Sequence, residues 1–251
     1  MNPRFDESTI RSFYSDSYYT GKAEYSYIDE RESYTYSSFV WDARLKHIRR
    51  FVKSGNFLDV GCSFGGFLSR ASRYFTPYGI ELSEYSSDYA RTKFGLNVFT
   101  GTLLDSPYQS GMFSVISMIE IIEHLDDPLA ALIHCRKLLQ DKGLLVIQTA
   151  DMDGWQAVNA GKSYHYYLPG HLSYFTEKSL RYALAKAGFS RVVVYRPVDF
   201  GLIPKLRKSR GGFKTLSDYI KWIAITKYHL KGYFSHKGRP LTSSMVIYAF
   251  V

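Results

Sequence analysis

The chain has 251 residues, is 45% hydrophobic and carries a net charge of +9, a composition typical of a soluble globular protein with one large domain, or one domain and an appendage. It begins with polar residues that are unlike a secretion signal, and it lacks the run of about 18 apolar residues that would span a membrane. Neither the two cysteines, Cys62 and Cys135, nor the seven histidines have metal-ligand spacing, so we expect a cytoplasmic protein without a metal.

The first part of the chain is rich in tyrosine, serine and acidic residues. Residues 1–40 show a poor apolar pattern, and we expect loops and short helices that lie over another part of the protein. Apolar residues then recur in steps of three and four between Val40 and Val52, which predicts the first long helix. We therefore interpret residues 1–53 as a lid followed by a helix.

The middle of the chain alternates between short apolar runs and helical patterns. The runs predict seven strands, over residues 57–60, 78–82, 97–100, 113–118, 144–149, 191–196 and, at the end of the chain, 243–251. The clearest helices are predicted from the glycine turn to about residue 74, over 128–139 after Asp127-Pro128, and over 177–187, and Ser83 is expected to cap another. This order predicts an α/β fold with an open, mostly parallel sheet and helices on both faces, in which 54–200 form the core and 241–251 its final strand.

Residues 57–68, with the sequence FLDVGCSFGGFL, are the most informative stretch. An apolar strand containing Asp59 passes through a turn with Gly61 and Gly65 into a helix, an arrangement that presents backbone N–H groups to a ligand. A dinucleotide site would have the pattern G-x-G-x-x-G, but Ser63 stands where its middle glycine would be. On this motif alone, an ordinary glycine-rich turn of a Rossmann-like domain remains the alternative.

This motif resembles motif I of the class I S-adenosylmethionine-dependent methyltransferases. Five further segments are similar to the same family, in the same order: GIELSE (79–84), GTLLDSPY (101–108), FSVISMIEIIEHLDDPLAAL (113–132), KGLLVIQT (142–149) and GHLSYFTEKSLRYALAKAGF (170–189). From about residue 13 to 197 the chain resembles the subfamily that includes the ubiquinone-biosynthesis O-methyltransferases and methyltransferases of glycan and secondary-metabolite gene clusters. The resemblance implies a Rossmann-like fold with a seven-stranded, mostly parallel sheet whose last strand is antiparallel, between the fifth and the sixth.

The resemblance also implies S-adenosylmethionine as the cofactor, with S-adenosylhomocysteine as its product. The glycine turn is implied to contact the methionine part of the cofactor. The acid after the second strand is implied to contact the ribose, and the segment after the third strand is implied to contact the adenine. The residues concerned are Asp59, Gly61, Cys62, Ser63, Gly65, Glu81, Leu82, Thr102, Leu103 and Glu120. Many relatives have aspartate at position 102, so backbone groups and Leu103 are expected to make the adenine contact here.

Three residues are candidates for catalysis at the acceptor, namely Glu120, His124 and His171. Neutral histidine can remove a proton from an acceptor hydroxyl, since its reference pKa is about 6.5. His171 lies in an aromatic stretch, residues 164–175, that we expect to line the acceptor pocket. The alternatives are a charged strand end for Glu120 and structural hydrogen bonds or simple packing for the two histidines.

The segment 201–240 has ten lysines and arginines and one acid, a net charge of +9 that equals the charge of the whole chain. Seven of its residues fall mostly on one helical face, namely Phe213, Leu216, Tyr219, Ile220, Ile223, Ala224 and Leu230. We interpret the segment as an insertion, either a lid whose apolar face is buried against the core or a basic helix in peripheral contact with an anionic membrane. The lid is the interpretation that we favour.

The residues and the resemblance together predict a cytoplasmic S-adenosylmethionine-dependent methyltransferase. We expect it to methylate a small or carrier-linked acceptor at oxygen by direct displacement, for which the acceptor, the methyl group and the sulfur atom must be aligned. An RNA methyltransferase that uses the basic segment is one alternative, although the sequence has no RNA-binding motif and we do not expect a nucleic-acid partner. A non-catalytic cofactor-binding scaffold is the other, because fold does not fix function.

Overall fold

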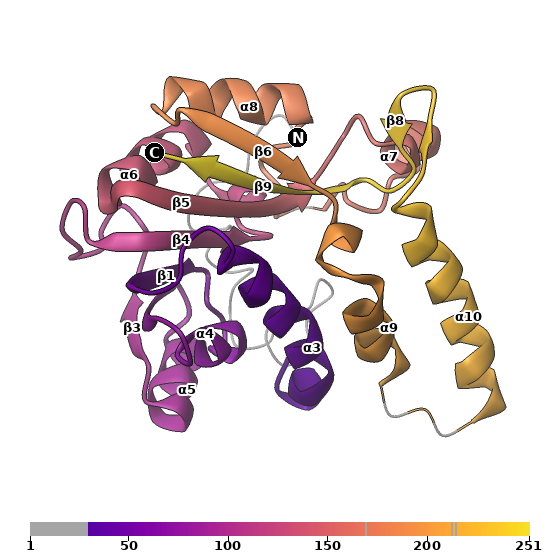
Figure 1. Cartoon of the computed structure of the whole chain (residues 1–251), viewed down its shortest axis with the longest axis horizontal. Helices are drawn as coiled ribbons and strands as arrows, with labels where there is room; N and C mark the ends of the chain where they lie inside the picture. Colours follow the sequence, from indigo (N-terminus) through magenta and orange to yellow (C-terminus); the bar gives the residue numbers. More distant parts are fainter. Residues whose placement is uncertain (1–29, 169, 212, 214) are drawn as a thin grey trace.

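A computed structural model of the protein describes residues 30–168, 170–211, 213 and 215–251 (Figure 1). Within these residues the main sheet has seven strands in the order β3-β2-β1-β4-β5-β9-β6. Their bounds are β1 (Asn56–Val60), β2 (Thr76–Glu81), β3 (Asn97–Thr100), β4 (Phe113–Ile119), β5 (Leu139–Ala150), β6 (Arg191–Tyr195) and β9 (Ser244–Phe250). Strands β1 to β5 pair in parallel, and β9 lies antiparallel between β5 and β6. The predicted α/β fold and the predicted place of its last strand are confirmed.

Helices cover both faces of this sheet (Figure 1). On one face α3 (Glu30–Ile48), α4 (Gly66–Ala71) and α5 (Glu84–Phe94) contribute to one apolar core, and on the other α6 (Pro128–Leu138) and α8 (Glu177–Lys186) contribute to a second. Strand β5 shows why its sequence is continuously apolar: Leu145 and Ile147 enter one core while Leu144 and Val146 enter the other.

Local sequence explains where several helices begin. Ser83 accepts a hydrogen bond from the backbone N–H of Ser86 at 3.3 Å, which confirms the predicted cap of α5. Asp127 accepts one from the N–H of Ala130 at 2.9 Å and starts α6. The cap of α5 follows a strand and the cap of α6 follows a short turn, both at the same edge of the sheet. The caps therefore set the direction in which the chain leaves that edge.

Helix α3 begins ten residues before the predicted start at Val40, so the prediction of loops and short helices is wrong for residues 30–40, which lie in one long helix. The buried face of α3 includes Ser37, Trp41, Arg44 and Ile48, whose spacing is helical although two of the four are polar. A search for apolar periodicity misses such a face. The part of the lid prediction that concerns residues 1–29 lies outside the described residues.

Shorter elements complete the chain. Helix α4 ends at Ala71, before the predicted position 74, and β5 starts five residues earlier than predicted. Elements that the sequence did not predict are the small helix α7 (Trp155–Ala160), the hairpin of β7 (Ser235–His236) and β8 (Arg239–Pro240), and the 3-10 turns η1 (Ile122–His124), η2 (Gly161–Ser163) and η3 (Pro197–Phe200). None of the helices that the structure describes is both long enough and apolar enough to cross a membrane.

The basic insertion forms a helix pair, α9 (Leu202–Arg210) and α10 (Leu216–Lys231), that stands beside α3 (Figure 1). Helix α9 packs on α3 and α10 packs on α9, where the Trp222 indole N–H donates to the carbonyl of Leu206 at 3.0 Å. The apolar residues Leu216, Ile220 and Ile223 are 79%, 62% and 52% exposed. The prediction that this face is buried against the core is therefore wrong, because α10 is the outer member of the pair and turns its Trp222 side inward.

Candidate functional site

A cavity of about 1260 Å³ opens at the carboxyl edge of the sheet. Val60 of β1 is aligned with Ile80 of β2 and Met118 of β4, so these three strands end at one level. Residues after these ends form one wall, and α3, α9 and α10 contribute the other. The cavity exceeds the roughly 300–1,000 Å³ of most ligand sites, which leaves room for a cofactor and an acceptor together.

The turn after β1 has the backbone conformation that its glycines allow. Gly61, Ser63 and Gly65 have φ of 73°, 48° and 77°. A Cβ atom at Gly61 would lie 2.1 Å from Ile121 Cδ1, so this position requires glycine. Ser63 takes the left-handed conformation without being glycine, and such backbone strain concentrates at functional sites.

Glu81, at the end of β2, holds this turn in place. Its Oε2 accepts a hydrogen bond from the Ser63 N–H at 2.8 Å, and its Oε1 accepts one from the Ser83 N–H at 3.0 Å. The Ser63 hydroxyl is buried, lies on the cavity wall and has no hydrogen-bond partner among the described residues. A buried hydroxyl without a partner beside a buried carboxylate suits a ligand rich in hydroxyl groups, such as a ribose. The residues present therefore fit the expected cofactor.

The structure separates the predicted cofactor residues into two groups. Eight of the predicted site residues line the cavity: Gly61, Ser63, Glu81, Leu82, Thr102, Leu103, Glu120 and His124. Asp59 lies beneath it, where its Oδ1 accepts a hydrogen bond from Ser117 of the neighbouring strand β4 at 2.5 Å. Gly65 and Cys62 act in packing, since a Cβ atom at Gly65 would lie 2.7 Å from Leu96 Cδ1 and the Cys62 thiol lies against Gly79. Burial raises the pKa of the Cys62 thiol well above its ordinary value, which makes it a poor nucleophile.

Two carboxyl groups lie close together at the cavity wall: Glu120 lines the cavity, and Glu123 is buried behind it. Glu120, which has a positive φ of 56°, accepts hydrogen bonds from Gln148 Nε2 at 2.6 Å and from the Tyr166 hydroxyl at 2.9 Å. Glu123 accepts one from the Thr149 hydroxyl at 3.0 Å and also bonds to Tyr166. Burial and the nearby Glu120 raise the pKa of Glu123 to about 8. The raised pKa favours the protonated form of Glu123, and the Tyr166 hydroxyl lies between the two carboxyl groups within hydrogen-bond distance of both.

His124 and His171 lie next to these acids, with ring centroids 4.7 Å apart. The Nδ1 atom of His124 lies 2.9 Å from the Gly170 carbonyl, and that of His171 lies 2.7 Å from the Tyr166 carbonyl. Each Nδ1 therefore carries the proton and donates it, which leaves Nε2 as the basic atom. Burial and the neighbouring His171 lower the pKa of His124 to about 4, and burial lowers that of His171. Both rings are neutral at physiological pH, and His124 is the one on the cavity wall.

Within the described residues, Glu123, His124 and His171 could together hold a metal ion, since each offers a ligand atom within 4.8 Å of the others. The Nδ1–H bonds to backbone carbonyls orient the rings as in many metal-binding histidines. The sequence spacing hid this group, because His171 comes from the loop before α8. The absence of a metal remains a prediction.

Sequence reasoning missed several cavity residues. Arg44 of α3 donates from Nη2 to Gln148 Oε1, so a hydrogen-bonded chain runs from Arg44 through Gln148 to Glu120. Nothing in the sequence indicated Arg44, because it lies in a helix face of mixed polarity. Lys205 also lines the cavity, and the sequence showed only that it lies in a basic segment. Tyr166 lies in the aromatic stretch 164–175, which was expected to line the acceptor pocket, but none of the described residues of that stretch is on the cavity wall. The Tyr166 hydroxyl instead bonds to Glu120, which does line the cavity.

Comparison with known proteins identifies the family of the chain. Residues 30–194 match the family described as a methyltransferase domain. A ubiquinone biosynthesis O-methyltransferase from Caulobacter sp. (strain K31) is 32% identical over 124 residues, which cover 42% of this chain and 48% of that protein. The alignment thus spans about half the length of that relative.

Solved structures show the same fold. A SAM-dependent methyltransferase from Thermotoga maritima is 18% identical, with a TM-score of 0.58 over 88% of this chain and 94% of that one. Phosphoethanolamine N-methyltransferase 2 of Haemonchus contortus, solved in complex with S-adenosyl-L-methionine, is 15% identical, with a TM-score of 0.63 over 96% of this chain and 59% of that one. Geranyl diphosphate C-methyltransferase from Streptomyces coelicolor is 12% identical, with a TM-score of 0.57 over 83% of this chain and 77% of that one.

The family match covers more than half of the chain, and the fold and the glycine turn agree with it. The chain belongs to the methyltransferase family, whose cofactor is S-adenosylmethionine.

Proposed function

We propose that this methyltransferase transfers a methyl group from S-adenosylmethionine to an oxygen atom of a small or carrier-linked acceptor. The observation that carries the proposal is the layout of one cavity: Gly61, Ser63 and Glu81 lie at one part of its wall, and Glu120 and His124 lie at another. The O-methyltransferase relative supports oxygen as the acceptor atom. The structural neighbours named above include N- and C-methyltransferases, so the fold itself favours no acceptor atom.

When bound, the cofactor supplies a sulfonium methyl group that is already activated toward a nucleophile. The chain has to bind both reactants, align them and exclude water. Ser63 and Glu81 would hold the ribose, and Glu120 would orient the acceptor, with its carboxylate fixed by Gln148 and Tyr166.

His124 Nε2 would accept a hydrogen bond from the acceptor hydroxyl and then take its proton. With a pKa of about 4, His124 is a weak base. A weak base is sufficient here, because a hydroxyl oxygen that gains a methyl group becomes far more acidic than an imidazolium. The proton therefore moves to Nε2 as the methyl group arrives, and the ring returns it to solvent after product release.

The experiment that tests the proposal is a panel of acceptors with labelled S-adenosylmethionine, comprising phenols, sugars and primary amines, analysed by the position of the new methyl group. Methylation at oxygen is expected. Transfer to amines alone would overturn the proposal that the acceptor atom is oxygen, and it would still support methyltransferase activity. Binding of the cofactor without transfer to any acceptor would favour a non-catalytic scaffold instead.

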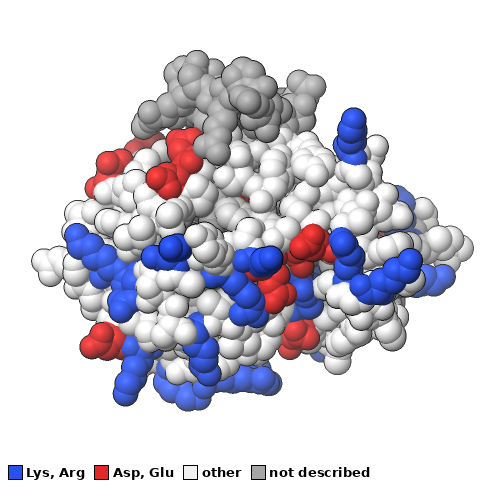
Figure 2. Space-filling model, turned by 90° about the horizontal axis from the view of Figure 1, so that it is seen from above, with Lys and Arg blue, Asp and Glu red and all other residues white. Residues whose placement is uncertain are grey.

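We also propose that α10 brings the protein to an anionic lipid surface, which would suit a lipid-linked acceptor. Its outward face combines the exposed Leu216, Ile220 and Ile223 with Lys227 and Lys231, which are also exposed. Interfacial helices typically combine apolar residues that enter the lipid interface with neighbouring lysines that contact anionic headgroups. On the face seen in Figure 2, lysine and arginine side chains gather mainly in the middle and lower part, with acidic side chains among them. Charge complementarity thus favours an anionic membrane as the partner.

Vesicle co-sedimentation tests this contact. Binding to anionic vesicles but not to neutral ones is expected, with a loss as the salt concentration rises. The double substitution Ile220→Ser and Ile223→Ser should abolish it, whereas Ile133→Ser, at an exposed position of α6, should leave it unchanged. Equal, negligible binding to both vesicle types would reject the contact. RNA binding in the same salt range would favour the RNA methyltransferase.

A further inference from the structure

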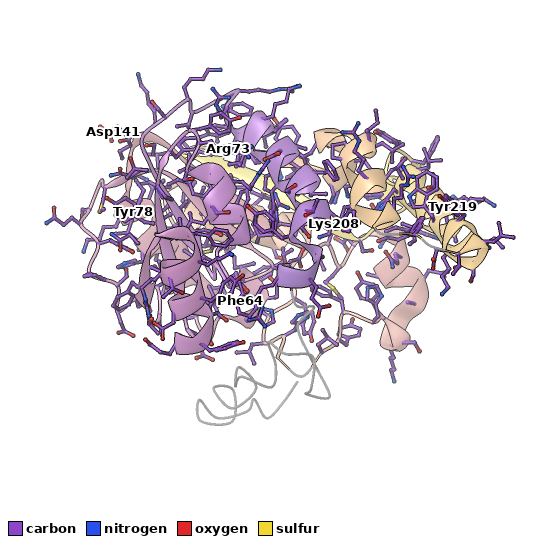
Figure 3. The ribbon with its side chains drawn as sticks, turned by 90° about the horizontal axis from the view of Figure 1, so that it is seen from below. Phe64, Arg73, Tyr78, Asp141, Lys208 and Tyr219 are labelled. Atoms are coloured by element: carbon purple, nitrogen blue, oxygen red, sulfur yellow. The ribbon has the colours of Figure 1, made fainter. Side chains whose placement is uncertain are left out.

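A third part of the cavity wall is basic. Arg44 of α3, Lys205 and Lys208 of α9 and His229 of α10 all line it. Figure 3 labels Lys208 of α9, near the centre of that view. These four residues come from three different helices. Their convergence on one cavity results from the packing of α9 against α3 and α10.

Lys205 has the most unusual environment of the four. Its ammonium group forms no hydrogen bond or ion pair with any residue that the structure describes. Burial, followed by the charges of Arg44 and Lys208, lowers its pKa to about 8, and Asp199 opposes this only weakly. Removing an ammonium from water without a fixed counter-charge is costly. An anion in the cavity would remove that cost.

The neighbours of Lys205 add donors for such an anion. Arg44 donates from Nη2 to the amide oxygen of Gln148. Burial and Lys205 lower the pKa of His229 to about 4, and its Nε2 lies 3.2 Å from the Ser209 hydroxyl. His229 is therefore neutral, and the charge of this wall comes from Arg44, Lys205 and Lys208.

We propose that Arg44, Lys205 and Lys208 form a subsite for an anionic group of the acceptor, either a phosphate-type group or a carboxylate. This inference rests on the proposed function, because it assigns a substrate class to the same cavity. The hydrogen-bonded chain from Arg44 through Gln148 to Glu120 places the subsite beside the acids where the acceptor is oriented. The acceptor is therefore an anionic molecule whose methylated atom lies close to its negative group. Lysine and arginine are the usual ligands of such groups.

Calorimetry on the full chain, saturated with S-adenosylhomocysteine, tests the subsite with inorganic sulfate and phosphate as tetrahedral probes and malonate as a carboxylate probe. Saturable binding of at least one probe is expected. Lys205→Met should weaken it about tenfold or more, the effect of losing one charge-assisted hydrogen bond. Lys205→Arg should retain most of the affinity. Lys221→Met, at an exposed position of α10, is the matched control and should bind like the wild type.

The pH dependence of sulfate binding distinguishes Lys205 from surface lysines. Sulfate keeps its charge over the range in which Lys205 titrates, so its affinity should fall as the pH rises through about 8, the pKa of Lys205. The groups that face Lys205 are Arg44, Lys208, His229 and Asp199, and His229 has already lost its proton at this pH. Lys205→Met should lack the fall. Ordinary exposed lysines would hold the anion to a pH of about 10.

The two proposals fail in different ways. Lys205→Met should bind S-adenosylhomocysteine as tightly as the wild type, which also shows that the variant is folded. No saturable binding of any probe, or equal probe affinity in Lys205→Met and the wild type, would overturn the subsite. Binding of sulfate without binding of S-adenosylhomocysteine would instead overturn the proposed function and leave the subsite in place.

Discussion

Replacing Glu123 with glutamine should change how the stability of the protein depends on pH. Glu123 is buried against Glu120, and its pKa is raised to about 8. In the unfolded chain a glutamate has a pKa of about 4.3, so between these values the folded state binds a proton that the unfolded state has released. Stability from this group is therefore lost as the pH rises from about 4.3 to 8, and glutamine, which cannot ionise, has no such loss.

The magnitude follows from the two pKa values. Between pH 6 and 8, the folded state holds one proton that the unfolded state lacks. This difference lowers the free energy of unfolding over that range by about 1–2.5 kcal/mol, and the lower figure applies to a folded-state pKa nearer 7. Urea unfolding of the wild type and Glu123→Gln at both pH values measures this, and the difference between the proteins cancels the titration of other groups. A pH dependence that is the same in both proteins would refute the raised pKa of Glu123.

Three further predictions concern the site. His124→Ala should lower turnover of a hydroxyl acceptor by about 10²–10⁴ and leave cofactor affinity intact, whereas His171→Ala should lower turnover less. Full activity in both variants would leave alignment of the reactants as the only mechanism. Ser63→Gly should relieve the left-handed strain at φ 48° and raise the free energy of unfolding by about 0.5–1 kcal/mol in urea titrations, and a clear loss of stability would contradict this reading of the turn. Methyl transfer should survive chelation of divalent metals; a loss that added metal reverses would assign Glu123, His124 and His171 as ligands.

The fold could be predicted from the sequence because its signals are local. Apolar runs, the glycine turn and caps such as Ser83 each depend on a few neighbouring residues, and the order of strands and helices limits the topology. The start of α3 could not be found in this way, since its buried face includes Ser37 and Arg44. The exposure of Ile220 could not be found either, because the apolar pattern of α10 does not say which face packs on α9.

The site residues also divide into those that local sequence could predict and those that it could not. Gly61, Ser63 and Glu81 follow strand ends, so their meeting at one edge could be predicted from a parallel sheet. Asp59 follows the same logic, yet the structure places it under the cavity, against Ser117. Lys205 could not be assigned, because its place in the cavity depends on how α9 packs against α3, and no local pattern in the sequence encodes that contact.

Calorimetric titration with S-adenosylmethionine and S-adenosylhomocysteine is the measurement that tests the central claim most directly. The wild type should bind with micromolar affinity, about −8 kcal/mol. Glu81→Ala should weaken binding by about 1.5–3 kcal/mol, since a hydrogen bond to a charged group is lost, while Glu84→Ala, at an exposed position of α5, should have no effect. Binding of NAD with no binding of either S-adenosyl compound would contradict the account.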